Sequence, residues 1–264
     1  MLPRVNLARC DDADYLLFST RDLITNTLLQ SGRWEPNLVA ITRMFTSGVD
    51  APLVLDIGAN LGAYTIPVAK ELQKLSGTMY AFEPQRIVYY QLCGNIFLNR
   101  LDNVFAANQA VGETEGTVEI PRIDYENFMN IGGFSIDSKY RKLNGTEAAM
   151  RSGGESVPLV KLDSLSLPER AAFIKLDVEG SELGVLKGGR HFLGKNLYPP
   201  ILFEAWHESW FEEEKAALLT MFRELGYGVT AIGGYDHLAQ HPDHPVQVRF
   251  DKQEDGTTTV ARFR

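Results

Sequence analysis

Charged and apolar residues alternate over residues 173–182 (Phe-Ile-Lys-Leu-Asp-Val-Glu-Gly-Ser-Glu), a stretch with the residue types that acid–base chemistry needs. Lys175, Asp177 and Glu179 are spaced two residues apart, so they would share one face of an extended strand. A central parallel strand is usually apolar on both faces, and burying three charges costs free energy unless they are paired. Because such an arrangement is seldom purely structural, we expect these side chains to serve function. The alternative is that the strand ends at Asp177 and that Glu179 caps the next helix.

A glycine-containing turn between a strand and a helix is the second candidate site. Residues 53–55 form the apolar run of a buried parallel strand, Asp56 follows near its carboxyl end, and Gly58 and Gly62 bracket a tight turn. In open α/β sheets, ligands bind at such a turn, where helix N–H groups point outward. Asn60 occupies the place of the central glycine of the dinucleotide fingerprint, which disfavours an NAD-type enzyme. We expect a ligand-binding loop, with a purely structural turn as the alternative.

An acidic residue follows the next predicted strand, at residues 78–82. Glu83 stands at its carboxyl end, where a carboxylate can accept hydrogen bonds from both hydroxyls of a ribose. Glu83 would otherwise cap the helix that begins near Gln85, with Pro84 in its first turn. The two roles are compatible.

The elements that position these residues indicate one α/β domain with additions. Residues 1–50 predict an N-terminal helical cap over the glycine turn, with helices near residues 23–29 and 37–45; sheet-edge packing is the alternative role. Residues 51–264 predict the main domain, and residues 246–250 and 257–263 predict its closing strands. Residues 114–158 fit this core poorly and predict an inserted hairpin and loop, which is either a lid or a surface excursion.

Composition narrows the class of protein. The chain has 264 residues, 44% of them hydrophobic, with a net charge of −8, which argues against a nucleic-acid surface. Cys10 and Cys93 are far apart and in no metal-binding spacing, so we expect free thiols in a reducing compartment. Since we find neither a leader pattern nor an apolar run of membrane-spanning length, we expect a cytoplasmic protein.

Three stretches together resemble the FkbM family of S-adenosylmethionine (SAM)-dependent methyltransferases. They are residues 54–62 (Val-Leu-Asp-Ile-Gly-Ala-Asn-Leu-Gly), the Phe82-Glu83-Pro84 step and residues 174–182, and the similarity runs from about residue 53 to residue 204. The resemblance implies a class I SAM methyltransferase fold, which is Rossmann-like, with a seven-stranded, mostly parallel sheet flanked by helices. It also implies SAM as cofactor, S-adenosylhomocysteine (SAH) as product, and methyl transfer to a hydroxyl of a sugar, glycan or polyketide-type natural product.

The resemblance also implies a set of cofactor-binding residues at the ends of the first strands. We expect this set to comprise Asp56, Gly58, Ala59, Asn60, Gly62, Tyr64, Thr65, Glu83, Pro84, Gln109, Ala110 and Asp177.

Methyl transfer to an alcohol requires a base, because the enzyme must align the hydroxyl and remove its proton as the bond forms. Asp177 would take this proton or hold the amino group of SAM, and Glu179 is the alternative base. Lys175 would pair with either carboxylate and hold it ionised, and His207 is a weaker candidate base. Asp177, Glu179 and Glu204 would also suit a divalent cation such as Mg²⁺, but a metal site is not favoured.

Several functional alternatives stay open. They are an N- or carboxyl-methyltransferase acting on a small molecule or peptide, and a SAM-binding protein without catalysis. Trp206 and Trp210 would line a substrate pocket or simply pack on the sheet. We expect a small-molecule or glycan acceptor as partner and no nucleic acid; the sequence is also compatible with a homodimer.

Overall fold

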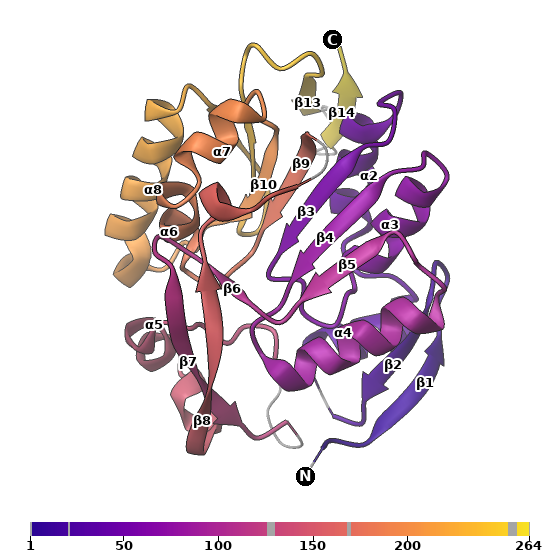
Figure 1. The fold of residues 1–264 in the computed structure, drawn as a ribbon, viewed down its shortest axis with the longest axis vertical. Helices are drawn as coiled ribbons and strands as arrows, with labels where there is room; N and C mark the ends of the chain where they lie inside the picture. Colours follow the sequence, from indigo (N-terminus) through magenta and orange to yellow (C-terminus); the bar gives the residue numbers. More distant parts are fainter. Residues whose placement is uncertain (1, 21, 126–129, 168–169, 253–257, 264) are drawn as a thin grey trace.

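A seven-stranded sheet runs through the centre of the computed structural model, which describes residues 2–20, 22–125, 130–167, 170–252 and 258–263 (Figure 1). Its strand order is β11-β12-β10-β9-β3-β4-β5, and β12 is the antiparallel strand. The strands are β3 (Leu53–Ile57), β4 (Thr78–Phe82), β5 (Val104–Ala107), β9 (Ala171–Leu176), β10 (Ile201–Glu204), β11 (Gly228–Gly233) and β12 (Asp236–Gln240). This confirms the predicted seven-stranded, mostly parallel sheet.

Helices cover both faces of this sheet. On one face lie α2 (Pro36–Thr46), α3 (Thr65–Gln73) and α4 (Arg86–Leu98); on the other lie α6 (Glu182–Lys187), α7 (Arg190–Lys195) and α8 (Glu212–Glu224). Successive residues of a strand face opposite sides, so Val54 packs with the first group while Leu53 and Leu55 pack with the second. β3 is buried along its whole length, as its apolar run predicts.

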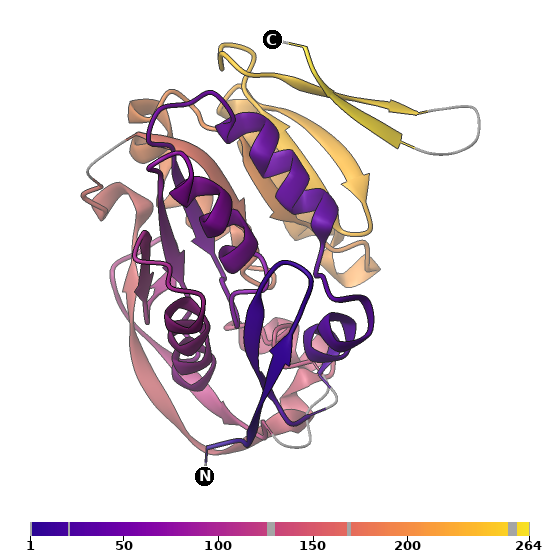
Figure 2. The same ribbon diagram turned by 90° about the vertical axis from the view of Figure 1, so that its right-hand side faces the viewer.

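The N-terminal region contains a β-hairpin in addition to helices. β1 (Val5–Arg9) pairs antiparallel with β2 (Asp14–Phe18), and α1 (Leu23–Ser31) follows before α2 (Figure 2). Two side chains of α4 bind the hairpin: Asn95 Oδ1 accepts from Leu16 N at 2.6 Å, and Gln91 Nε2 donates to Leu16 O at 2.7 Å. The predicted helical cap therefore differs from the structure by this hairpin, which α4 anchors to the core.

Residues 110–160 contribute a second, smaller sheet beside the main one. β6 (Ala110–Val111), β8 (Met150–Val160) and β7 (Gly116–Ile123) lie in that order, and β7 and β8 form a long antiparallel hairpin. Between them lie α5 (Ser138–Leu143) and a 3₁₀ turn, η1 (Thr146–Ala149). Residues 126–129 of the predicted insertion lie outside the described residues. Two further 3₁₀ turns, η2 (Leu162–Ser164) and η3 (Ser209–Phe211), follow β8 and β10.

Strands are present near residues 246–250 and 257–263, as predicted, but they do not close the main sheet. β13 (Val248–Lys252) and β14 (Thr258–Arg262) pair with each other in a separate two-stranded sheet, near the C-terminus in Figure 2. The main sheet is closed by β11 and β12 instead. Positive φ angles of 149° at Gly233 and 53° at Gly234 turn the chain back tightly, so residues 236–240 return as strand β12. Among the described residues, none of the helices combines the length and apolar composition that a membrane crossing requires.

Candidate active site

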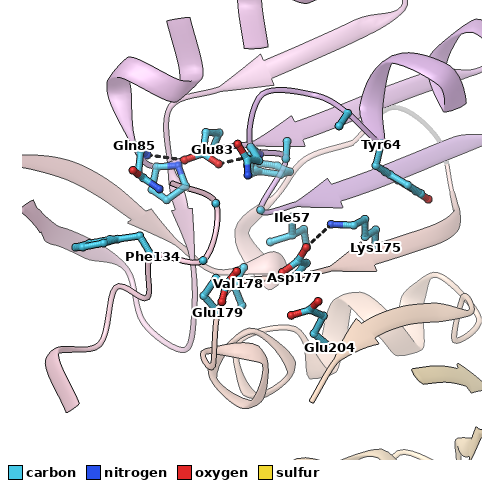
Figure 3. Close-up of a pocket in the computed structure, with 18 of the residues that line it drawn as sticks. Ile57, Tyr64, Glu83, Gln85, Phe134, Lys175, Asp177, Val178, Glu179 and Glu204 are labelled. Carbon is cyan, nitrogen blue, oxygen red and sulfur yellow. Dashed lines mark hydrogen bonds and ion pairs between the residues drawn. The ribbon is translucent and has the colours of Figure 1, made fainter. Parts of the chain in front are cut away.

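A pocket of about 260 Å³ lies at the carboxyl ends of β3, β4, β9 and β10 (Figure 3). The chain order reverses here, because β4 lies on one side of β3 and β9 on the other. Ligands of open α/β sheets bind at such a reversal. The N-terminal region adds Trp34 and Glu35 to the lining, and residues 130–136 of the insertion add Phe134. The pocket therefore combines the strand ends of the main sheet with the N-terminal region and the insertion.

A buried lysine lies between two aspartates beside the pocket. Lys175 Nζ is 2.8 Å from Asp177 Oδ2 and 3.9 Å from Asp56 Oδ1. Asp56 and Lys175 are partners in the register of β3 and β9, so their side chains leave the same face of the sheet. Burial disfavours the charged lysine, but the negative charges of Asp177, Asp56 and Glu35 outweigh it and raise the pKa of Lys175. The lysine is therefore a fixed cation.

The glycine turn brings two strand ends into direct contact. Gly58 has φ 90°, and a Cβ there would lie 1.7 Å from the backbone oxygen of Asp177. Asn60 follows with φ 51°, a left-handed conformation that asparagine tolerates better than most residues. Gly62 has φ 92° and packs against Leu92 instead of lining the pocket. Gly58 thus serves first to let the loop touch the end of β9.

Glu83 holds the same loop from the other side. Its Oε2 accepts from Asn60 N at 2.9 Å, and its Oε1 accepts from Gln85 N at 2.8 Å. Burial outweighs these two bonds and raises the pKa of Glu83 to about 7. Each carboxylate oxygen has a second lone pair, so Glu83 can still accept a hydrogen bond from a ligand in the pocket that it lines.

The chain turns directly after β9, which corrects the expectation of an extended strand through Glu179. β9 ends at Leu176, and Glu179 has a left-handed φ of 55°. Glu182 Oε1 accepts from Val178 N at 3.0 Å and from Gly180 N at 3.3 Å, so Glu182 rather than Glu179 binds the backbone of this turn. The turn nevertheless keeps Asp177 and Glu179 at the same pocket.

Acidic side chains gather at one end of the pocket (Figure 3). Asp177, Glu179 and Glu204 offer carboxylate oxygens that lie within 4.8 Å of one another. Burial, helped by the charges of Asp177 and Glu182, raises the pKa of Glu179 well above its ordinary value. Burial together with the charges of Asp177 and Glu179 raises the pKa of Glu204 as well. Carboxylates this close hold a proton between them, unless a cation takes its place.

The structure brings most of the predicted site residues to this pocket. Those that line it are Gly58, Ala59, Asn60, Tyr64, Glu83, Pro84, Gln109, Ala110, Lys175, Asp177 and Glu179. Asp56 and Thr65 lie beneath the lining, where Thr65 Oγ1 donates to Asp56 Oδ2 at 2.5 Å.

His207 lies away from the pocket and is exposed at the surface. Its Nε2 is 2.8 Å from Gly234 O, and its Nδ1 is 2.8 Å from Lys215 Nζ. Trp206 lines the pocket, whereas Trp210 packs with Tyr140 and Phe211 nearby.

Sequence reasoning missed the contribution of the N-terminal region. Glu35 lines the pocket in a left-handed conformation with φ 43°, and burial raises its pKa to about 7. It stands at the N-cap of α2, but its side chain makes no capping bond. An acidic residue directly before the first-turn Pro36 reads as an ordinary cap, so the sequence carries no signal for this role.

Comparison with known proteins identifies relatives. The family model described as Methyltransferase FkbM domain matches residues 56–229. The methyltransferase sdnD of Sordaria araneosa is 28% identical over 206 residues, which cover 68% of this chain and 74% of that protein. The solved FkbM methyltransferase of Methylobacillus flagellatus KT is 18% identical with a TM-score of 0.41; the alignment covers 91% of this chain and 52% of that one. A putative O-methyltransferase from Klebsiella pneumoniae is 16% identical with a TM-score of 0.45, covering 78% of this chain and 79% of that one. This chain thus spans about half the length of the Methylobacillus protein.

Proposed function

This chain belongs to the FkbM family of methyltransferases, and we propose that it methylates a hydroxyl oxygen of a sugar, glycan or polyketide-type small molecule. It is a SAM-dependent methyltransferase with a class I fold. Which atom of which acceptor receives the methyl group is the proposed part. We argue it from the charges and the geometry at the pocket.

The residues around the pocket fit SAM. Glu83 has free lone pairs for the ribose hydroxyls, and Gln109 and Ala110 line the pocket beside it, where the adenine would lie. A side chain at Gly58 would clash with the backbone of Asp177, so only glycine lets the loop pack closely against the end of β9 beside the ligand. The carboxylate of Asp177 suits the ammonium group of the methionine part. When bound, SAM supplies a methyl group made electrophilic by a positive sulfonium.

We assign the base to the acidic end of the pocket. Asp177 pairs with Lys175 at 2.8 Å, which favours its ionised form. An ionised Asp177 suits the role of binding the ammonium group of SAM. Glu179 and Glu204 share a site with raised pKa values, so an ionised Glu179 accepts a proton more strongly than an ordinary carboxylate. Glu179 is therefore the preferred base for the acceptor hydroxyl. Asp177 is the alternative base. We no longer favour His207, because it is exposed and lies away from the pocket.

The charges at this end favour a hydroxyl over a carboxyl acceptor. Among the described residues, Glu35, Asp177, Glu179 and Glu204 line the pocket together with one cation, Lys175, which Asp56 and Asp177 already neutralise. An anionic acceptor would meet the charge of Asp177 and the charge that Glu179 and Glu204 keep while they share a proton, whereas a neutral hydroxyl would meet hydrogen-bond acceptors. This surplus of carboxylates is the observation that carries the proposal. An amine acceptor, which is cationic or neutral, stays the second candidate for the same reason.

The test combines binding with transfer. The protein is titrated calorimetrically with SAM, SAH and NAD⁺, and we expect micromolar binding of the first two and none of NAD⁺. Labelled methyl transfer from SAM is then measured on a panel of glycosides, polyketides, amines and carboxylic acids. Transfer to a hydroxyl of the first two groups, abolished in Asp177→Ala, supports the proposal; transfer restricted to amines or carboxylates overturns it. SAM binding without transfer to any acceptor would favour a non-catalytic role.

A further inference from the structure

Residues 130–136 of the insertion form one wall of the pocket. Asn130, Gly132, Gly133, Phe134 and Ile136 all line it. Figure 3 shows Phe134 on the same side as Gln85, away from Lys175. The motifs of the glycine loop and of β9 do not include this segment, so its place at the pocket needs a separate explanation.

Hydrogen bonds to both backbone groups of one residue, Ile131, hold this wall. The N–H of Ile131 donates to Asp22 Oδ1 at 3.0 Å, and its carbonyl accepts from Gln85 Nε2 at 3.2 Å. Asp22 is 3% exposed and Gln85 is 6% exposed, so water does not compete for either bond. The Ile131 side chain is itself buried and packs with Phe18 and Val88. The segment is therefore fixed at Ile131 to both the N-terminal region and α4.

The same network continues into the glycine loop. Gln85 N and Asn60 N both donate to the carboxylate of Glu83. A Cβ on Gly132 would lie 2.2 Å from Asn60 Nδ2, so the insertion rests directly on the loop. Asn60 cannot move away freely, because its Oδ1 accepts from Leu61 N at 2.7 Å. A shift of residues 131–132 would therefore also displace Asn60 and the glycine loop.

We infer that Asp22 and Gln85 are positioning residues of the SAM site, which hold residues 130–136 against the glycine loop and Glu83. Gln85 also lines the pocket, whereas the lining residues do not include Asp22, so Asp22→Ser separates the anchoring role from direct contact with the ligand. Asp22 has an ordinary role too, since its Oδ2 accepts from Thr25 N at 3.2 Å and caps α1. One oxygen serves the helix and the other serves the pocket wall, so the two roles can be separated by substitution. The inference rests on the proposed cofactor role of Glu83 and the glycine loop.

The experiment compares two matched glutamine variants. Gln85→Met removes the bond from the N-cap of α4 to Ile131, and Gln91→Met removes the bond of an equally buried glutamine within α4 to Leu16 O, which lies in β2. We expect both to lose similar thermal stability. SAH affinity, measured by calorimetry, should fall about tenfold in Gln85→Met, the equivalent of about 1.4 kcal/mol, and stay within about twofold in Gln91→Met. Equal losses of SAH affinity in the two variants would overturn the inference.

Two further measurements complete the test. Asp22→Ser keeps a capping hydroxyl for α1 but is too short to reach Ile131, so it should weaken SAH binding like Gln85→Met. Hydrogen exchange of residues 130–136 should slow on SAH binding in the wild type and in Gln91→Met, and much less in Gln85→Met. Unchanged protection in Gln85→Met would contradict the positioning role. If the wild-type protein does not bind SAH at all, the proposed cofactor site fails first, and the inference with it.

Discussion

Asp56 and Lys175 lie side by side on neighbouring parallel strands, with the lysine Nζ 3.9 Å from a carboxylate oxygen for which the described residues provide no hydrogen-bond donor. Asp56 is fully buried and Lys175 nearly so. The ring of Tyr64 covers the ammonium group at 5.5 Å. The first acidic residue of the glycine motif therefore serves as a counter-charge beneath the pocket, and Lys175 links it to Asp177, which does line the pocket.

Removing the lysine charge should destabilise the fold. In Lys175→Met, the fully buried Asp56 loses its counter-charge, and breaking a buried pair in this way costs about 3–5 kcal/mol. Urea unfolding measures this loss. The double variant Asp56→Asn/Lys175→Met should recover part of it, because the amide carries no charge. A loss below about 1 kcal/mol in the single variant would contradict the pairing.

Glu179→Gln should separate binding from chemistry. The amide keeps the size of the side chain but cannot take a proton, so we expect methyl transfer to fall by about 10²–10⁴-fold while SAH affinity stays within about twofold. Glu213→Gln, on the exposed first turn of α8, is the control and should keep full activity. If Glu179→Gln transferred the methyl group at the wild-type rate, Glu179 would not be the base and Asp177 would become the preferred candidate.

Stability should fall as the pH rises through the titration of Glu182. Burial raises its pKa to about 7 in the folded protein, against an ordinary value of 4.5. The folded state therefore keeps a proton that the unfolded state releases, and the stabilisation is complete below pH 4.5 and lost as the pH rises to about 7. The titration of Glu182 therefore changes the free energy of unfolding by up to about 3 kcal/mol across this pH range.

Urea unfolding of Glu182→Gln at pH 5 and pH 8 isolates this contribution. The amide oxygen can still accept from Val178 N and Gly180 N, so the turn should persist while the slope with pH becomes shallower. An unchanged slope would show that Glu182 does not titrate in this window.

Gly58→Ala should prevent the loop from reaching the end of β9. The added methyl would lie 1.7 Å from the Asp177 backbone oxygen, and the positive φ disfavours alanine as well. We expect a loss of more than about 4 kcal/mol, seen in urea unfolding or as a drop in soluble yield. Gly194→Ala, within helix α7 and with no atom closer than 3.5 Å, should be neutral or stabilising by up to about 1 kcal/mol. Equal behaviour of the two variants would contradict this account.

Chelation should leave methyl transfer unchanged. Asp177, Glu179 and Glu204 are close enough for a divalent cation, but Lys175 already pairs with Asp177, and Glu179 and Glu204 can share a proton. Activity after exhaustive dialysis against a chelator tests this. Loss of activity that Mg²⁺ restores would identify the three carboxylates as a metal site.

Sequence patterns predicted those parts of the fold that depend on neighbouring residues in the chain. The apolar run from Leu53 and the glycines after it predict the strand, turn and helix of the glycine loop, and the structure contains all three. Lys175 was expected to pair with either Asp177 or Glu179, and the structure pairs it with Asp177.

The rest depends on contacts between distant residues, which spacing does not encode. Glu35 lies at the pocket because α2 packs against β9. The residues next to Glu35 in the sequence do not indicate this packing. His207 follows β10 closely, but the chain carries its ring to Gly234 and Lys215. The second acidic contact of Lys175, with Asp56, is likewise visible only once the register of β3 and β9 is known.

The bond between Ile131 and Asp22 has a consequence for the order of folding, because it joins residues 109 positions apart in the chain. Closing so long a loop costs entropy that local helices and neighbouring strands do not have to pay. The pairing of β3 with β4, which are close in sequence, can form without it. The pairing of β3 with β9, however, joins residues 119 positions apart, so the centre of the sheet bears the same entropic cost as this wall of the pocket, and regaining the local strand pairs alone does not restore a protein that can hold SAM.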